Sequence, residues 1–257
     1  CIPSKALIHQ AERYRSLTEI EELGIGIDRS SFHYKKVFDK SRKAADTLSK
    51  GINFLLKKNK VDLFESMGRI TGKNEVSLAN GKKITGRNIV IATGSRSREI
   101  PGFAFDEKYV LSSTGILMQE TLPDKILIIG GGAIGVEFAY IMHSFDVEVV
   151  LVEVLDRILP LEDEEVSTAL ARTFRKKGIR VMTGTKALSM SVKDRRVSVN
   201  MQDKKGKQET IGSPSHRNNC CRSGSCCGGK GSQFLRTWLG RNGNRNGSGV
   251  YPSGRLL

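Results

Sequence analysis

A glycine-rich turn between an apolar strand and a helix constrains the fold of this chain more than any other feature. The apolar stretch "KILII" at 125–129 runs directly into Gly130, Gly132 and Gly135, and apolar residues at helical spacing follow. A second apolar run then ends at Glu153. Strand, turn, helix and strand within about 30 residues make a βαβ unit. The chain is therefore predicted to be of the α/β class, with a parallel sheet.

The spacing of these glycines is that of a dinucleotide-binding turn. Gly130 permits the tight turn, Gly132 lets a pyrophosphate approach the backbone, and Gly135 lets helix and strand pack closely. Amides at the helix N-terminus offer donors and partial positive charge to phosphates. Glu153 stands where a carboxylate accepts from an adenine-ribose 2′-hydroxyl and repels a 2′-phosphate, so NAD is favoured over NADP. The predicted NAD contacts in the turn are Gly130, Gly131, Gly132, Ala133, Ile134, Gly135, Val136 and Glu137.

Apolar periodicity predicts further elements on both sides of this unit. Helical spacing is found over 3–17 and 31–61, and strand-like segments over 61–72 and 75–94. The Asn80-Gly81 pair predicts a hairpin turn. After the βαβ unit we expect a helix, a strand and an antiparallel meander. The acidic run Glu162–Glu165 begins that helix, where negative charge is favourable.

Two shorter motifs gain meaning only beside the glycine turn. The chain opens on "CIPSK", so Cys1 precedes a helix start and Lys5 follows one turn later, and both surroundings favour a thiolate. A single cysteine in such a place is more often inert. The stretch "IATGSR" holds Ala92, Thr93 and Gly94. Together with "GGGAIGVE", these motifs resemble the flavoprotein disulfide reductases, and among them most closely the dihydrolipoamide dehydrogenases, over roughly residues 1–211.

The resemblance implies a role for each matching residue. Cys1 corresponds to the flavin-side cysteine of a redox disulfide. Lys5 is implied to lie near a flavin ring nitrogen and to form a buried ion pair with Glu137, which needs both charges. These three are the expected catalytic residues. The further expected cofactor contacts are Gly72, Ala92, Thr93 and Gly94 for FAD and Ala187 for NAD, with Lys5 also touching FAD.

The same resemblance implies the architecture and the reaction. It predicts doubly wound, Rossmann-type FAD and NAD domains, both incomplete: 1–122 is a partial FAD-binding domain, 123–211 is most of the NAD-binding domain, and 212–257 is a disordered tail. Electrons would pass from dihydrolipoamide through a redox disulfide and FAD to NAD. The implied partner is the lipoyl domain of a 2-oxo-acid dehydrogenase complex. The parent is expected to be a homodimer in the cytoplasm, or in the mitochondrial matrix of a eukaryote.

Departures from the family pattern leave alternatives open. The first redox cysteine, the first glycine motif and a C-terminal His-Glu pair are missing from the 257 residues, so we expect this chain to be inactive by itself and poorly soluble. Another reductase of the family, such as a mercuric reductase, is one alternative. A non-catalytic NAD-binding remnant with a disordered basic tail is the other.

Residues 211–257 differ sharply in composition from the rest. They hold seven basic residues, no Asp or Glu, and four of the five cysteines. The net charge of +15 would alone suggest nucleic acid, but +7 of it lies in this tail and the first 210 residues carry only +8, so no nucleic-acid partner is expected. The cysteine pairs lack the C-x2-C spacing of zinc sites, so no metal is expected.

A shifted reading frame explains the tail better than a function does. Permitted codons, read one nucleotide later, allow "AVGRAPN" and "LEEMGIETDRGFIRVDDY", which resemble the family's continuation at the expected spacing. We therefore interpret the tail as translated out of frame. No apolar run approaches the roughly 20 residues of a membrane span, and no membrane partner is expected.

Overall fold

The computed structural model describes residues 1–193 and 196–212, together with the backbone of 233–236. The chain divides into two compact units, residues 1–42 with 97–240 and residues 43–96 with 241–257. This division differs from the boundaries expected at 122 and 211. Helix α1 (Ile2–Glu22) joins the first unit because it packs against helix α4 (Ala133–Ser144), and helix α2 (Tyr34–Lys58) crosses from one unit to the other.

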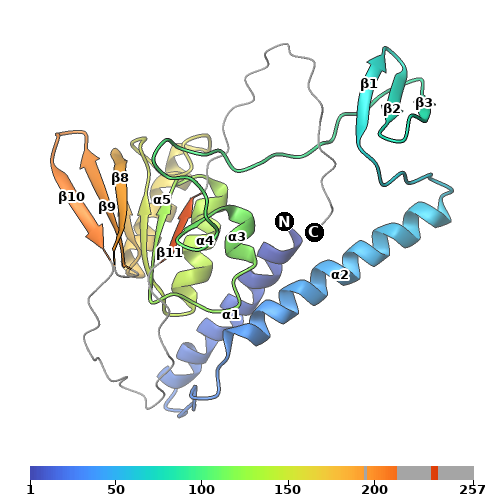
Figure 1. The fold of residues 1–257 in the computed structure, drawn as a ribbon. Helices are drawn as coiled ribbons and strands as arrows, with labels where there is room; N and C mark the ends of the chain where they lie inside the picture. The colour runs from blue at the N-terminus through green and yellow to red at the C-terminus, as the bar shows by residue number, and fades with distance from the viewer. Residues whose placement is uncertain (194–195, 213–232, 237–257) are drawn as a thin grey trace. The chain divides into compact units, whose positions relative to one another are not determined.

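A five-stranded parallel sheet forms the centre of the first unit (Figure 1). Its strands, in spatial order, are β4 (Val110–Leu111), β11 (Gln233–Arg236), β5 (Lys125–Ile129), β6 (Glu148–Val152) and β7 (Arg180–Met182). Strands β5 and β6 are joined through α4, so the predicted βαβ unit is confirmed. The short helix α3 (Ser113–Leu117) follows β4.

Both faces of this sheet are buried, because side chains along a strand point to alternate faces. In β5, Ile126 and Ile128 belong to one core, whereas Leu127 belongs to the other. In β6, Val149 and Val150 are divided in the same way. In a parallel strand that is covered on both faces, successive side chains are all buried and therefore apolar. This explains the unbroken apolar runs of the sequence.

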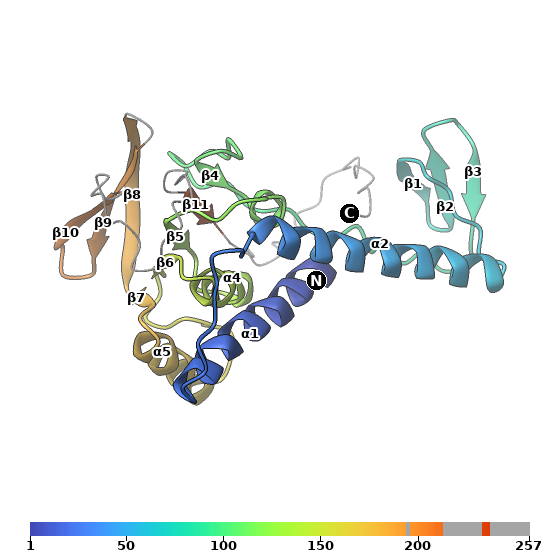
Figure 2. The same ribbon diagram turned by 90° about the horizontal axis from the view of Figure 1, so that it is seen from below.

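Helices cover one face of the sheet and a meander covers the other. Helix α4 packs on β5 and β6 and lies between the sheet and α1 (Figure 2), and α5 (Glu164–Lys176) joins the same core. On the other face lie β8 (Thr185–Lys193), β9 (Arg196–Asp203) and β10 (Gln208–Gly212), paired antiparallel in the order β10-β9-β8. The predicted helix, strand and meander after β6 are thus confirmed.

The second unit contains a small antiparallel sheet in the order β1-β2-β3. Its strands are β1 (Gly68–Gly72), β2 (Glu75–Leu78) and β3 (Lys83–Thr85). The predicted hairpin at Asn80-Gly81 is confirmed, since these residues lie in the turn between β2 and β3 and Gly81 has φ +83°.

The two predicted strand segments of this unit form only in part. Strands β1, β2 and β3 lie within the expected 61–72 and 75–94, but residues 61–67 and 86–94 have no strand structure, and Val90 and Ile91 are 87% and 59% exposed. A strand is stable only with a partner, and no other strand in the described part of the unit pairs with either of these two stretches. Apolar residues alone were therefore not sufficient to predict a strand here.

One short piece of the tail is an ordered strand. The tail was expected to lack structure, but the four residues of β11 pair in parallel with both β4 and β5. This pairing places β11 in the middle of the sheet. The cysteines at 220, 221, 226 and 227 lie outside the described residues.

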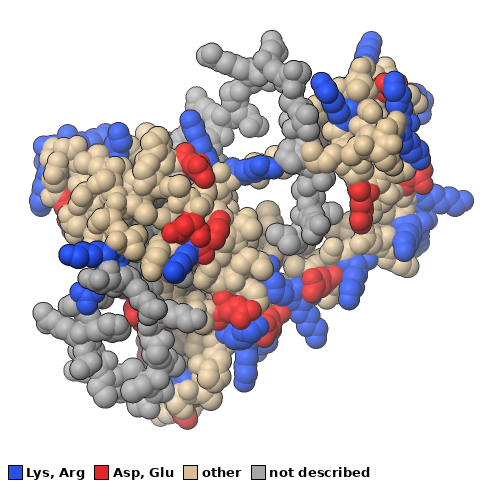
Figure 3. Space-filling view, in the orientation of Figure 1, with Lys and Arg blue, Asp and Glu red and all other residues tan. Residues whose placement is uncertain are grey.

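The surface of the described residues carries charges of both signs. On the face shown in Figure 3, acidic side chains lie among the Lys and Arg side chains. None of the helices in the described ranges is both long and apolar enough for a membrane crossing.

Asp146, in the turn after α4, fastens α1 to that helix. Its φ of +64° is a conformation that side-chain residues adopt only with strain. The Asp146 carboxylate accepts a hydrogen bond from the Tyr14 hydroxyl at 3.1 Å, and an Arg15 nitrogen lies 3.9 Å from it. Burial and then the Asp146 charge raise the pKa of Tyr14, so the hydroxyl remains a donor at neutral pH.

Replacing Asp146 should separate the two effects of this residue. Asp146→Ala loses the carboxylate and keeps the unfavourable φ, and urea denaturation should show a loss of about 1–2 kcal/mol. Asp146→Gly loses the same carboxylate but adopts this φ freely, so it should be more stable than the alanine variant by about 1 kcal/mol. Equal stability of the two variants would show that the φ carries no strain.

Candidate functional site

The turn between β5 and α4 is held from behind by Glu153, the residue that follows β6. Gly130 has φ +111°, a left-handed conformation that favours glycine, and its N–H donates to Val152 O at 2.8 Å. Glu153 Oε2 accepts from Gly131 N–H at 2.7 Å, and Oε1 accepts from Leu155 N–H at 2.8 Å. The residue is 6% exposed. Because hydrogen bonds to a charged carboxylate are strong, Glu153 fixes the turn relative to β6.

Gly131 has no room for a side chain. A Cβ atom there would lie 2.9 Å from Ile158 Cγ2 and 3.1 Å from Glu153 Cβ. The dinucleotide-binding pattern assigns functions to Gly130, Gly132 and Gly135, but it does not include Gly131 or its role in packing. Three consecutive glycines at 130–132 were the signal that could have indicated it.

Gly132 faces open space and begins α4. No heavy atom lies within 4 Å of the position that its Cβ would take, and no side chain caps the helix at this residue. The first amides of a helix have no acceptor within it, so those that follow Gly132 can bind an anion. Gly135 and Val136 are buried in α4, which agrees with close packing at the third glycine. These residues fit a dinucleotide diphosphate.

The Glu153 carboxylate retains capacity for a sugar hydroxyl. A carboxylate has about four acceptor positions, and the two amide bonds occupy two of them. Its position beside Gly131 brings the expected ribose acceptor and the expected phosphate-binding turn into contact. The two sequence-predicted parts of the NAD site therefore lie together.

Lys5 and Glu137 form the ion pair that the resemblance implied. The Lys5 ammonium, in the first turn of α1, donates to Glu137 Oε1 on α4. The expectation that this pair is buried is wrong for this chain, since the side chains are 63% and 29% exposed. Pro3 and Ser4 are the buried residues of that turn. Lys5 lies about 200° around the helix from Pro3 and so points away from the core.

Cys1 is an exposed free cysteine at the N-cap of α1. Its carbonyl accepts from Lys5 N–H and from Ser4 Oγ, each at 3.0 Å. No other cysteine has a described side chain, so the described residues provide no disulfide partner for it.

The residues expected to contact FAD are divided between the two compact units. Gly72 ends β1, and Ala92, Thr93 and Gly94 are exposed residues outside any strand. These four belong to the second unit, whereas Cys1 and Lys5 belong to the first, so no single compact unit holds them all. The assignment of these residues to a flavin site therefore stays a prediction.

Ala187, the residue expected to line the NAD pocket, lies on β8 beside a register shift. The antiparallel pairing with β9 is irregular between Ala187 and Ser189. Its side chain packs against the core between the meander and the parallel sheet. Ala187 and the glycine turn belong to the same compact unit. Over residues 1–193 and 196–212, no group of three or more His, Cys, Asp or Glu is arranged to hold a metal ion.

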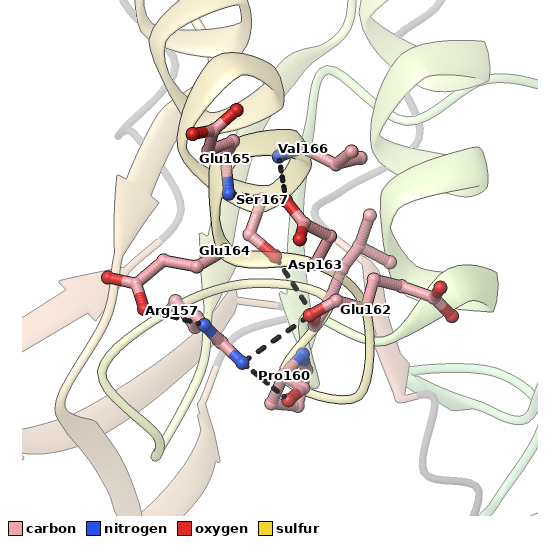
Figure 4. Close-up of polar contacts among 9 residues, drawn as sticks. Arg157, Pro160, Glu162, Asp163, Glu164, Glu165, Val166 and Ser167 are labelled. Carbon is pink, nitrogen blue, oxygen red and sulfur yellow. Dashed lines mark hydrogen bonds and ion pairs between the residues drawn. The ribbon is translucent and has the colours of Figure 1, made fainter.

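The loop between Glu153 and α5 contributes residues that the sequence did not indicate. Leu159 N–H donates to Gly131 O at 2.7 Å, so the loop reaches the glycine turn. Asp163 caps α5 by accepting from Glu165 N–H and Val166 N–H (Figure 4). The acidic run was expected to lie in the first turn of this helix, and Glu164 and Glu165 do.

Alanine at Gly131 tests the packing of the turn. Because a Cβ there would meet backbone and side-chain atoms at 2.9–3.3 Å, Gly131→Ala should lower the free energy of unfolding by about 1–3 kcal/mol. Gly132→Ala, one residue further and in open space, is the matched control and should cost clearly less. Urea denaturation measures both, and a Gly131→Ala variant as stable as the unaltered chain would contradict the packing described.

Comparisons with known proteins show similarity to one family of oxidoreductases. A family model for pyridine nucleotide-disulphide oxidoreductases matches residues 1–212. The dihydrolipoyl dehydrogenase of Bacillus subtilis is 40% identical over 200 residues, which are 73% of this chain and 42% of that protein. That of Mycobacterium leprae is 42% identical over 199 residues, 74% of this chain and 42% of that protein.

The fold also matches a solved structure. The crystal structure of LpdA from Mycobacterium tuberculosis superimposes with a TM-score of 0.70 at 20% identity, covering 91% of this chain and 48% of that one. The chain thus spans less than half the length of the relatives compared.

Proposed function

Because the chain belongs to the pyridine nucleotide-disulphide oxidoreductase family, we propose that it is part of a dihydrolipoamide dehydrogenase and that its first unit binds NAD. The observation that carries the proposal is the bond from Gly131 N–H to the buried Glu153 carboxylate, beside the open position at Gly132. The identity to two dihydrolipoyl dehydrogenases supports the choice among reductases of this family. We assign 123–211 to a doubly wound NAD-binding domain and 1–122 to part of an FAD-binding domain.

Each residue of the turn has a physical role in holding NAD. Gly132 leaves space for the diphosphate, and the amides of Ala133 and Ile134 donate to it. Glu153 accepts from an adenosine ribose hydroxyl with the positions that its two amide bonds leave free. The same negative charge disfavours a 2′-phosphate, so NADPH should bind more weakly than NADH.

The remaining assignments concern the redox centre of the whole enzyme. Bound FAD would supply the transfer of electrons between a redox disulfide and nicotinamide. Cys1 is assigned as the flavin-side thiol and Lys5, oriented by Glu137, as the cation near the flavin ring. Gly72 and the run Ala92–Gly94 are assigned as backbone contacts to FAD. The whole enzyme is proposed to be a cytoplasmic homodimer that oxidises the dihydrolipoamide of a lipoyl domain.

A second candidate is an NAD-binding protein without redox activity. Two observations favour it for these 257 residues. The described side chains include a single cysteine, and the expected FAD contacts Ala92, Thr93 and Gly94 are exposed. A dihydrolipoamide reaction needs a disulfide that opens and closes, and the described side chains supply one cysteine for it.

Titration with NADH, followed by nicotinamide fluorescence, tests the assigned site. The folded chain should bind NADH saturably, and Glu153→Gln should weaken binding about 10-fold or more, because hydrogen bonds to a charged group contribute about 1.5–3 kcal/mol. Glu148→Gln is the matched control, since Glu148 lies at the other end of β6, exposed, and pairs with Lys125. A folded chain that is indifferent to NADH would refute the proposed function.

Activity and colour separate the two candidates. With dihydrolipoamide and NAD⁺, we expect the 257-residue chain to form no NADH, and we expect purified protein to lack flavin absorbance near 450 nm. NADH formation, or a stoichiometric flavin spectrum, would show that the chain assembles a redox centre and would contradict the second candidate.

A further inference from the structure

The loop that follows Glu153 contacts the glycine turn directly. We call residues 157–163 the clamp loop. Gly131 uses both of its backbone polar groups in this region: its N–H donates to Glu153, and its carbonyl accepts from Leu159 N–H at 2.7 Å. Ile158, fully buried, fills the space over Gly131. The turn is thus fixed by Glu153 and the clamp loop together.

Leu159 makes this contact from an unfavourable backbone conformation. Its φ is +47°, in the left-handed region where side-chain residues are rare. Such a conformation persists only where the surroundings enforce it. The Leu159 carbonyl accepts from Ser167 Oγ and from Glu162 N–H, each at 3.0 Å. Ser167 is completely buried in α5, so its hydroxyl is a fixed anchor for the loop.

Arg157 closes the loop on itself and onto α5 (Figure 4). One guanidinium nitrogen donates to Pro160 O at 3.2 Å and to Glu162 O at 3.4 Å, and another lies 3.2 Å from Glu164 Oε2. The planar fork of an arginine suits several acceptors at once, which a lysine cannot match. These donors are occupied within the loop, so Arg157 does not offer them to a 2′-phosphate.

We propose that Arg157 and Ser167 are positioning residues for dinucleotide binding, which act through Leu159 and Gly131. They hold Leu159 in the conformation that directs its N–H to Gly131 O, and this bond sets the orientation of the peptide between Gly131 and Gly132. Gly132, whose N–H belongs to that peptide, borders the open space assigned to the diphosphate. The proposal rests on the proposed NAD site and extends it to a loop that does not touch the nucleotide.

A purely structural role is the competing interpretation. Arg157 would then stabilise the start of α5, and its loss would lower stability without changing ligand affinity. Ligands with and without a diphosphate distinguish the two, because the clamp loop acts on the turn that receives that group. ADP-ribose carries the diphosphate and adenosine does not.

The test measures dissociation constants of Arg157→Gln and Ser167→Ala for NADH, ADP-ribose and adenosine by calorimetry and fluorescence. Each variant should bind NADH and ADP-ribose about 5- to 10-fold more weakly than the unaltered chain, which is the loss of affinity expected for one hydrogen bond. The dissociation constant for adenosine should change by less than about 2-fold. Arg157→Lys, which keeps the charge near Glu164 without the fork, should recover only part of the ADP-ribose affinity.

The matched control is Arg180→Gln, which removes another exposed ion pair of the same unit. Arg180 donates to both oxygens of Glu209 at 2.7 and 2.8 Å, between β7 and β10. It should leave all three affinities unchanged. Unchanged ADP-ribose affinity in folded Arg157→Gln would overturn the proposal. If that variant does not fold, by circular dichroism, an unchanged affinity in Ser167→Ala overturns it.

The outcome also separates this proposal from the one on which it rests. An unaltered chain that binds no NADH refutes the NAD site itself. An unaltered chain that binds NADH, with variants that bind it equally well, refutes only the role of the clamp loop. An equal loss of affinity for ADP-ribose and for adenosine would also contradict the role of the clamp loop, because the effect would then not concern the diphosphate.

Discussion

The buried carboxylate of Glu153 is the interaction on which the arrangement of the first unit depends. A carboxylate that is 6% exposed is costly unless donors satisfy it, and the amides of Gly131 and Leu155 do so. One side chain therefore fixes the end of β6, the turn after β5 and the first residues of the loop that follows β6. The position of α4 follows, because that helix begins at the end of the turn. The turn proposed to bind a dinucleotide thus owes its position to the way one buried charge is compensated.

Periodicity in the sequence was sufficient where local pattern and tertiary structure agree. The runs that became β5 and β6 are apolar on both faces because helices cover one face and the meander covers the other. Residues 89–92 are also a continuous apolar run but have no strand partner, and Val90 is almost fully exposed. Strand formation depends on pairing, which composition does not encode. The position of β11 was not predictable for the same reason.

The site was predictable in its glycines and its carboxylate but not in the contacts that hold them. Gly130 needs its positive φ, which a glycine pattern indicates. Leu159 also has a positive φ, and nothing about a leucine indicates that conformation. The ion pair of Lys5 with Glu137 followed from resemblance, whereas its exposure depends on which side of α1 faces the core. Side-chain identity predicts chemistry better than it predicts burial.

Hydrogen exchange at single amides of the turn tests the role of Glu153 most directly. In the free chain, the Gly131 amide should already exchange slowly, because a buried carboxylate accepts from it. The amides of Ala133 and Ile134, without acceptors in the helix, should exchange fast and slow down only when NADH is added. A Gly131 amide that exchanges as fast as an exposed loop amide, with or without NADH, would contradict the account.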